Sequence, residues 1–337
     1  MALYNPRTCF PHREIVTVTN AVHIRLICAV LAGAVLPFAC SDALGATFSF
    51  AVITDPHLGG DPEHVAALRT AVDWLIANKD TKHIEVVFVL GDIGWGTSGD
   101  RCNLDIAREV LDPLNDVGLL YVPMLGDNEV QAHSESAYHA VFKDQYARLA
   151  KGLTNWNEAS TPVGDAFLHS FSFDHKGCHF SCPDFVSRVP GDEGAELNDV
   201  QNGTWTWFTA DIARCAKPGA ENIVTMTHHP MYNTGIILAD KFLFSKEEME
   251  AITGFLRNYA DSVDANYSGH IHMNSFRKVR SGDTEIYDAH VTDETWGPPG
   301  KPKSPEHSDV MIRWVSVDTD GPTVKYEQHL EEAVPTQ

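Results

Sequence analysis

The sequence of 337 residues predicts an α/β fold, in which strands and helices alternate along the chain. Two observations support this prediction. Continuous apolar runs rich in β-branched residues, typical of buried strands, alternate with segments in which apolar residues recur at helical spacing. In addition, 43% of the residues are hydrophobic, which is enough to build a large core, and no internal repeat interrupts the pattern.

The first half of the chain predicts three strands and three helices. The expected strands are the apolar runs Thr47–Thr54, Ile84–Leu90 and Leu119–Leu125. Apolar residues recur at intervals of three and four in the expected helices, which cover Glu63–Asn78, Leu104–Leu114 and Ala137–Leu149. Pro62 suits the start of the first helix, and Pro113 is expected to stop the second.

The second half predicts a hairpin, two further helices and more strands. Alternation from Phe167 to Phe173, continuing to Phe180, predicts two paired strands, and a polar loop follows over Pro183–Asn202. The other expected elements are helices over Trp205–Ala216 and Lys246–Tyr259, and strands over Ile223–Thr227 and Val263–Tyr267. The end of the chain, from Glu285 to Tyr326, is expected to be rich in strands.

The charge of the chain limits what it can bind. The formal net charge is −21 at pH 7, from 25 Lys and Arg against 46 Asp and Glu. Such a surface repels nucleic acids and anionic membranes, so we expect no nucleic-acid binding. It would also repel a substrate that carries phosphate, unless local positive charge comes from something other than Lys and Arg. Bound metal cations are the expected source.

Residues 1–46 are interpreted as a signal peptide or N-terminal leader. Two arginines precede an apolar run over Leu26–Ala39, and the small residues of Ala43–Ala46 offer a cleavage site. The run is shorter than the ~20 residues that a membrane span needs, so no stable membrane span is expected after removal of the leader. A secreted or periplasmic protein is therefore predicted. A lipoprotein anchored at Cys40 and an uncleaved anchor are the alternatives.

Four cysteines follow the leader: Cys102, Cys178, Cys182 and Cys215. An even number of cysteines in an exported protein permits disulfides, and four buried thiols are the alternative. No two of the four form a CxxC pair, which argues against a zinc site built from them.

Five polar clusters follow predicted strands. They are Asp55-Pro56-His57, Gly91-Asp92, Gly126-Asp127-Asn128-Glu129, His228-His229-Pro230 and Gly269-His270-Ile271-His272. Ligands gather at the carboxyl ends of strands in α/β sheets, and alternate residues of an extended segment point the same way. Carboxylate and imidazole groups together suit Zn, Mn, Fe and similar ions. Each cluster alone is weak evidence, but five in order predict a metal site.

These clusters resemble the signature of the calcineurin-like metallophosphoesterases, which include purple acid phosphatases and many phosphodiesterases. That signature runs DxH, GD, GNH(E/D), HxP and GHxH. The resemblance covers Phe48–Asn274, within a domain that we place at residues 47–330. It implies a two-sheet β-sandwich flanked by helices, with a two-metal site at its edge. It also implies hydrolysis of a small phosphodiester or phosphomonoester by attack of a metal-bound hydroxide on phosphorus.

The resemblance further implies the ligands of two metal ions, with Mn, Fe and Zn as the candidate metals. One ion would bind Asp55, His57 and His272. The other would bind Asp127, His228 and His270, and Asp92 would bridge the two. The sequence leaves the metal, the substrate and the oligomeric state open.

The third cluster departs from the family signature at two positions. Asp127 stands where the family usually has Asn, and it should still bind a metal ion. Asn128 stands where the family has a His that stabilises the transition state and can protonate the leaving group. Asn128 can hydrogen-bond a phosphoryl oxygen, but an amide cannot act as a proton-donating acid. A metal-binding module with weak or no catalysis is therefore the alternative function.

Another histidine would then have to supply the proton. His229 is the first candidate for this catalytic role because it adjoins a predicted ligand. His133, His139 and His290 are further candidates. A leaving group acidic enough to depart without protonation is another alternative.

Aromatic residues near the clusters have two interpretations. Trp95, Trp205, Trp207 and Trp296 can line a pocket, although core packing is favoured for each. No tyrosine follows Asp92 closely, as one does in purple acid phosphatases, so no tyrosinate–iron(III) site is expected. The turn-rich segment from Asp288 to Gly300 is either a wall of the substrate cleft or an ordinary surface loop.

Overall fold

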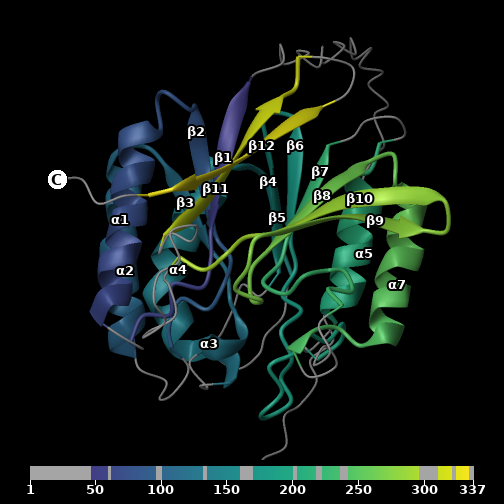
Figure 1. Ribbon diagram of the computed structural model, residues 1–337, viewed down its shortest axis with the longest axis horizontal. Coiled ribbons are helices and arrows are strands. Elements are labelled where there is room, and N and C mark those ends of the chain that lie inside the picture. The colour runs from purple at the N-terminus through teal and green to yellow at the C-terminus, as the bar shows by residue number, and fades with distance from the viewer. Residues whose placement is uncertain are drawn as a thin grey trace, which may run out of the picture. The chain divides into compact units, whose positions relative to one another are not determined.

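Two β-sheets face each other, and helices cover their outer faces (Figure 1). The computed structural model describes residues 47–59, 62–95, 101–131, 135–159, 170–199, 203–217, 222–235, 242–295, 310–320 and 324–333. These residues belong to one compact unit, Ala43–Gln337. The arrangement confirms the predicted two-sheet sandwich flanked by helices. The predicted leader over residues 1–46 lies outside the described residues.

Within the described ranges, the first sheet has five strands in the order β12-β11-β1-β2-β3. In it, β1, β2 and β3 run parallel, whereas β11 runs antiparallel to β1 and to β12. The strands are β1 (Phe48–Ile53), β2 (Ile84–Val89), β3 (Leu120–Pro123), β11 (Met311–Asp318) and β12 (Lys325–Glu332). The three parallel strands are the three that apolar runs predicted in the first half of the chain.

The second sheet has seven strands in the order β4-β5-β6-β7-β8-β10-β9. Its central strands β6, β7, β8 and β10 run parallel, and β5 and β6 form the predicted hairpin. The strands are β4 (Thr154–Glu158), β5 (Phe171–His175), β6 (Cys178–Cys182), β7 (Ile223–Met226), β8 (Val263–Ser268), β9 (Ser275–Ser281) and β10 (Thr284–Val291). We did not predict β4 and β9, because these edge strands are polar and largely exposed.

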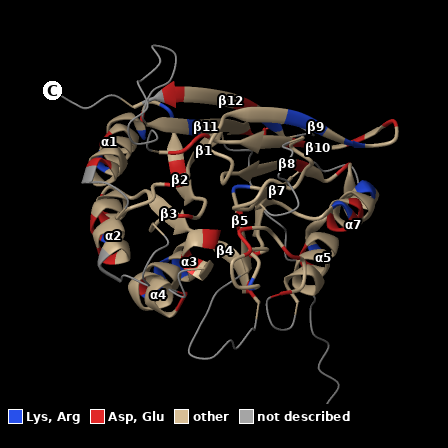
Figure 2. Cartoon of the chain, turned by 60° about the horizontal axis from the view of Figure 1, so that its bottom comes forward, with Lys and Arg blue, Asp and Glu red and all other residues tan. Residues whose placement is uncertain are grey.

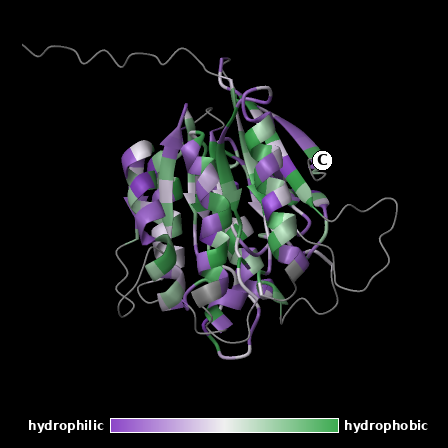
Figure 3. Ribbon diagram, turned by 90° about the vertical axis from the view of Figure 1, so that its left-hand side faces the viewer, coloured by the Kyte–Doolittle hydropathy of each residue, from purple (hydrophilic) through white to green (hydrophobic). Residues whose placement is uncertain are grey.

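Helices pack on the outer face of each sheet. The first sheet carries α1 (Pro62–Asn78), α2 (Arg101–Asp116) and α4 (Glu135–Gly152), and the second carries α5 (Thr204–Cys215) and α7 (Lys246–Leu256), which η1 (Arg257–Tyr259) extends. The helices show both hydrophilic and hydrophobic surfaces (Figure 3). This is the pattern of helices with one face on a core and the other in water. A short helix, α3 (Asp127–Gln131), begins just after β3.

The prediction that Pro113 stops the second helix was wrong. Helix α2 continues through Pro113 to Asp116. Proline removes the hydrogen bond to the carbonyl four residues earlier, that of Glu109, and its ring pushes that carbonyl outward. Because Glu109 is exposed, water can bond to that carbonyl in its place. The helix ends one turn later, before Gly118, whose φ of 82° suits the left-handed residue that commonly follows a helix.

Aromatic side chains fill the space between the two sheets. The ring of Phe50 on β1 contacts Phe180 on β6 and Tyr267 on β8, with ring centroids 5.4 and 5.2 Å apart. All three residues are fully buried, and burying each such side chain stabilises the fold by about 1.5–3 kcal/mol. This packing fixes the two sheets against each other, and with them the strand ends that carry the polar clusters.

Three further observations concern the cysteines, membrane-spanning helices and the distribution of acidic residues. Cys178, Cys182 and Cys215 are free thiols, so the alternative of buried thiols holds for the first two; the side chain of Cys102 is not among those described. Within the described ranges, no helix is long and apolar enough to cross a membrane. Asp and Glu are spread over the helices and the strands alike, as the net charge of −21 leads one to expect (Figure 2).

Candidate metal centre

Strand ends from both sheets meet at one edge of the sandwich and bring the predicted ligands together. The segments after β1, β2 and β3 supply Asp55, His57, Asp92 and Asp127, and the segments after β7 and β8 supply His228, His270 and His272. Backbone hydrogen bonds join neighbouring segments. Asp55 N donates to Gly91 O at 3.2 Å, and Gly269 N donates to His228 O at 3.0 Å.

Asp55, His57 and His272 form the first group, with ligand atoms within 4.8 Å of one another. Oδ1 of Asp55 lies 3.7 Å from His57 Nε2 and 3.4 Å from His272 Nε2. Among the described residues this oxygen has no hydrogen-bond partner, although it is buried. The other oxygen, Oδ2, accepts from Thr54 Oγ1 at 2.5 Å and from the backbone N–H of His270 at 3.0 Å. Asp55 is thus anchored through one oxygen and presents the other to the imidazoles.

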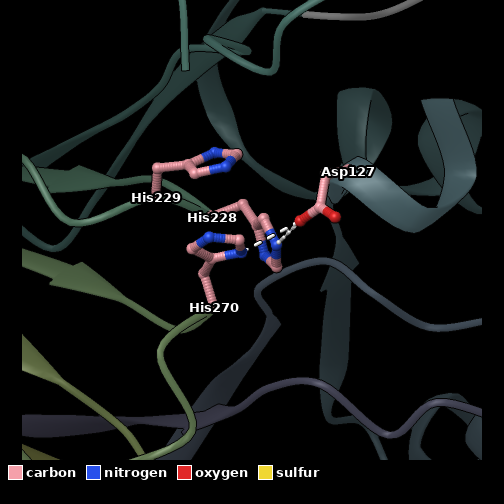
Figure 4. A group of neighbouring side chains, drawn as sticks. All are labelled: Asp127, His228, His229 and His270. Atoms are coloured by element: carbon pink, nitrogen blue, oxygen red, sulfur yellow. Dashed lines mark hydrogen bonds and ion pairs between the residues drawn. The ribbon is translucent and has the colours of Figure 1, made fainter. Parts of the chain in front are cut away.

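Asp127, His228 and His270 form the second group, beside His229 (Figure 4). Oδ1 of Asp127 lies 2.9 Å from both His228 Nε2 and His270 Nδ1. Each ring donates its other N–H to a backbone carbonyl: His228 Nδ1 to Leu90 O at 2.7 Å, and His270 Nε2 to Phe242 O at 2.6 Å. In a neutral imidazole this leaves a lone pair facing the carboxylate. Only a proton or a cation between them makes that contact favourable.

Asp92 lies between the two groups. Its Oδ2 is 3.4 Å from His57 Nε2 and its Oδ1 is 3.4 Å from His228 Nε2. Burial and the nearby carboxylate of Asp127 raise the pKa of Asp92 well above its ordinary value. Hydrogen bonds to His228 and His270 outweigh the effect of burial and hold the pKa of Asp127 well below its ordinary value. Asp92 is therefore placed where one carboxylate could contribute to both groups.

The backbone is strained at this edge. Eight described non-glycine residues have positive φ, and five of them are predicted ligands: Asp55, His57, Asp92, His270 and His272, with φ between 48° and 69°. A non-glycine residue in this left-handed region costs about 1–3 kcal/mol, and such residues cluster at functional sites. The fold therefore holds these five side chains in positions that ordinary extended backbone would not give.

Two glycines allow the segments to approach closely. A Cβ at Gly269 would lie 1.9 Å from Thr54 Oγ1 and 2.4 Å from Asp55 Oδ2. A Cβ at Gly126 would lie 2.2 Å from both the backbone N and Oδ1 of Asp92. Any side chain at either position would displace a predicted ligand.

The donor set fits two metal ions. Asp55, Asp92 and Asp127 are at most 5% exposed, and three buried carboxylates this close together need compensating positive charge. Four imidazoles surround them, and hydrogen bonds to backbone carbonyls fix the orientation of two, His228 and His270. Carboxylate oxygen with imidazole nitrogen is a ligand mixture that suits Zn, Mn and Fe. The structure thus brings together the seven residues that the sequence predicted as ligands.

Comparison with models of known protein families identifies the family of this chain. The family model described as calcineurin-like phosphoesterase matches residues 48–274, more than half of the chain. The chain belongs to the calcineurin-like phosphoesterase family. It is thus a metal-dependent phosphoesterase. A sequence search of the curated proteins finds no match.

Solved structures of similar fold agree with this assignment. A dimetal phosphatase from Danio rerio is 16% identical, with a TM-score of 0.55, and the match covers 85% of this chain and 99% of that chain. The purple acid phosphatase PPD1 from yellow lupin (Lupinus luteus) seeds is 12% identical, with a TM-score of 0.53, and covers 85% of this chain and 52% of that chain. At these identities the likeness shows the shared fold.

In this calcineurin-like phosphoesterase, Asn128 contacts Asp92, the carboxylate that lies between the two groups. Its side-chain Nδ2 donates to Asp92 Oδ2 at 2.5 Å, and its backbone N–H donates to Asp92 Oδ1 at 2.9 Å. Asn128 is the second residue of α3, so its backbone N–H is one of those that the helix itself leaves without a partner. Asn128 thus holds Asp92 in place, a role that its sequence position did not reveal.

His229 lies beside the second group, with a ring nitrogen within 4.8 Å of the ligand atoms of Asp127, His228 and His270. It is 1% exposed, its Nε2 donates to Glu193 O at 3.0 Å, and its ring centroid is 4.2 Å from that of His270. Burial, together with the neighbouring His270 and His228, lowers the pKa of His229 well below its ordinary value. A neutral, buried imidazole is better suited to packing against the second group than to donating a proton.

The other histidines and tryptophans are dispersed. His139 lies on α4, His290 packs between Tyr267 and Phe276, and His133 and Trp296 lie outside the described residues. Trp205 packs against Phe208 and Phe255 in the core behind the second sheet, as favoured. Trp95 differs: it is 41% exposed, and its ring centroid lies 4.9 Å from that of His57. Trp95 thus offers a flat apolar surface beside the first group.

Sequence reasoning gave no role to two acidic residues near the site. Glu129, 1% exposed, accepts from the backbone N–H groups of Gly94 and Gly126, both at 2.8 Å, and so ties the segment after β2 to the third cluster. Glu294 follows β10 and is 9% exposed; its Oε2 is buried and has no hydrogen-bond partner in the described part of the chain. Burial and Asp293 raise the pKa of Glu294 to about 9, and electrostatic interaction with His272 opposes this rise. Residues 292–295 therefore lie near the first group of predicted ligands, and a role for the segment as a wall of the substrate cleft stays a prediction.

Proposed function

We propose that this phosphoesterase hydrolyses phosphodiesters with good leaving groups, and that it acts outside the cytoplasm once its leader is removed. The observation that carries the substrate class is the contact of Asn128 with Asp92. Where the family has a proton-donating His, this chain has an amide already engaged by a carboxylate. A leaving group that departs as a stable anion needs no such donor.

Charge favours a diester over a monoester. A diester carries one negative charge at neutral pH, whereas a monoester carries nearly two. Asp127 adds a carboxylate where the family usually has a neutral Asn, and the chain as a whole carries a net charge of −21. The less anionic substrate is repelled less. Trp95, exposed beside His57, can pack against a flat leaving group.

Different residues would hold the metal ions and orient their ligands. One metal ion would be held by Asp55, His57 and His272. The other would be held by Asp127, His228 and His270, and Asp92 would contribute to both. When bound, the two cations would supply the Lewis acidity and charge neutralisation that phosphoester hydrolysis needs. Thr54, Leu90 and Phe242 orient the ligands through hydrogen bonds, and Asn128 orients Asp92. Mn, Fe and Zn are the candidate ions.

Turnover of bis-p-nitrophenyl phosphate tests this function. Metal-stripped protein is supplied in turn with Mn, Zn, Fe, Co and Ni, and an Asp92→Ala variant treated in the same way is the control. We expect metal-dependent release of p-nitrophenol, faster from this diester than from p-nitrophenyl phosphate. Turnover no greater than that of the control with every metal would contradict the proposal.

A metal-binding module with weak or no catalysis is the second candidate, and the engaged amide of Asn128 also favours it. The two functions differ in one measurement. A module would bind about two ions per chain, as the donor set suggests, without turnover above that of Asp92→Ala. Metal content and turnover measured on the same preparation separate the two.

A further inference from the structure

A second cavity lies between the two sheets and away from the predicted metal ligands. Its volume is about 340 Å³, within the range of sites for small molecules. Strands β8 to β12 line it, chiefly with Arg313, His290, Phe276, Gln328, Asp264 and Asp288. The hydroxyl of Tyr326 on β12 donates to Asp264 Oδ2 on β8 at 2.7 Å, which joins the two sheets beside the cavity.

Arg313 brings a buried positive charge to this cavity. It is 4% exposed, and its Nε and Nη2 donate to Thr292 Oγ1 at 3.0 Å and to Val291 O at 2.9 Å. Both acceptors are neutral, and no carboxylate among the described residues lies within ion-pair distance of the guanidinium. Burial lowers the pKa of Arg313. A buried guanidinium without a counter-charge is unfavourable unless an anion is bound.

One more polar group at the cavity lacks a partner. Gln328 donates from Nε2 to the hydroxyl of Tyr267, but its buried Oε1 has no hydrogen-bond partner in the described part of the chain. His290 stacks between Tyr267 and Phe276 and lines the cavity. Buried polar groups in folded proteins are nearly always hydrogen-bonded, so this oxygen and an unpaired guanidinium around one cavity indicate a missing ligand.

The opposite end of the cavity is acidic. Asp288 on β10 pairs with Ala265 on β8, so the neighbouring Asp264 lies close by. The exposed ammonium of Lys278 is 3.6 Å from Asp288 Oδ1. Arg313 binds the backbone at Val291, three residues along β10 from Asp288, which corresponds to roughly 10 Å of strand. The cavity therefore has a positive end and a negative end, about 10 Å apart.

We propose that this cavity binds a small zwitterion, with a carboxylate on Arg313 and an ammonium group at Asp264 and Asp288. The planar fork of a guanidinium matches a carboxylate. The exposed ring of Phe276 covers the carbon chain between the two charged groups. This site uses none of the predicted metal ligands, so it does not depend on the proposed phosphodiesterase activity.

Isothermal titration calorimetry with three matched compounds tests the proposal. The metal-stripped full chain is titrated with 6-aminohexanoate, which carries both charges, with hexanoate, which carries only the acid, and with hexylamine, which carries only the amine. Because each charged end contributes a charge-assisted hydrogen bond, 6-aminohexanoate should bind at least about tenfold more tightly than either of the others. Equal affinities for the three compounds, or no binding of 6-aminohexanoate, would overturn the proposal.

Three substitutions locate the binding. Asp288→Asn should weaken binding of 6-aminohexanoate about tenfold, because it removes the charge of one of the two carboxylates that face the ammonium group. Asp283→Asn, the same change at an exposed turn residue outside the cavity, should leave it unaltered. Arg313→Gln should abolish binding. If Arg313→Gln does not fold, Asp288→Asn alone still tests the proposal. An affinity of this variant for 6-aminohexanoate equal to that of the unmodified chain would refute the binding site.

Discussion

Asn128 holds Asp92 with two hydrogen bonds, one from its side-chain amide to Oδ2 and one from its backbone N–H to Oδ1. Asp92 is the carboxylate placed between the two groups of predicted ligands, so the residue that departs from the family signature acts on the centre of the site. Groups that orient metal ligands influence metal affinity and activity nearly as strongly as the ligands do.

Asn128→Ala should therefore weaken metal binding. The change removes the 2.5 Å bond to Oδ2 but keeps the backbone bond to Oδ1. We expect metal affinity and turnover of bis-p-nitrophenyl phosphate each to fall by about 10–100-fold, the range for loss of a group that orients a ligand. Titration of metal-stripped protein with Mn and Zn measures the affinity. Gln131→Ala, which lies on the same short helix but contacts the 187–192 loop, is the control and should bind metal normally.

Asn128→His tests whether a missing acid limits the rate. An imidazole at this position can donate a proton to the leaving oxygen, which an amide cannot. We expect the substitution to raise turnover more for diesters with poor leaving groups, such as alkyl esters, than for the nitrophenyl diester. The ratio of the two rates, measured in the unmodified chain and in the variant at equal metal content, reports the effect. A proportional change in both rates would exclude a limiting proton transfer.

Gly269→Ala should destroy the first group of ligands. The added Cβ would lie 2.4 Å from Asp55 Oδ2 and 1.9 Å from Thr54 Oγ1, so Asp55 must move. Gly254→Ala is the matched control, because its Cβ meets nothing within 4 Å in the interior of α7. We expect the control to gain up to about 1 kcal/mol in the free energy of unfolding and to keep its metal affinity. Gly269→Ala should lose metal binding, and full metal content in that variant would disprove the close packing of these segments.

The sequence predicted most of the fold and the place of the site. Buried parallel strands such as β1 and β2 leave continuous apolar runs, and Asp and His residues after successive strands must meet at one edge. The roles of Asn128 and Glu129 were not predictable, because they depend on the direction in which α3 starts relative to β2. The edge strands β4 and β9 left no apolar pattern, since water covers one side of each.

The second cavity was also invisible in the sequence. It depends on Arg313 meeting Val291 and Thr292, and on Tyr326 meeting Asp264, across two sheets and more than 20 residues of chain. No local pattern encodes such a meeting, and a lone Arg in a strand is ordinarily a surface residue. The burial of this Arg without a carboxylate became evident only from its three-dimensional surroundings.

Asp92→Asn should have opposite effects with and without metal. The pKa of Asp92 is raised in the folded chain by burial and by Asp127, so near pH 7 its ionised form destabilises the metal-free protein. Asn removes that charge, and the metal-free variant should unfold at the same or a higher temperature. Added Mn or Zn should raise the unfolding temperature of the unmodified chain much more than that of the variant, because only the former has the bridging carboxylate. Equal metal-induced shifts, measured by calorimetry, would show that Asp92 does not bind metal.

His179 should make the fold sensitive to alkaline pH. Its ring nitrogens lie 2.6 Å from Asp174 Oδ1 and 3.0 Å from Asp211 Oδ2, and both it and Asp211 are buried. Burial alone would lower the pKa of His179, but the hydrogen bonds to the two carboxylates raise it to about 11. Because this pKa lies above the ordinary value of about 6.5, protonation of His179 stabilises the folded chain fully below about pH 6.5. That stabilisation is lost as the pH rises toward 11.

His179→Asn measures this contribution directly. The free energy of unfolding by urea, determined at about pH 6, 7.5 and 9, should favour the unmodified chain most at pH 6, and the difference should shrink at each higher pH. His83→Asn makes the same chemical change at an exposed residue whose φ of 53° Asn also tolerates. Its effect should be small and constant with pH. A difference for His179→Asn that stayed constant from pH 6 to 9 would mean that His179 is neutral in the folded chain, and that the network with Asp174 and Asp211 holds no buried charge pair.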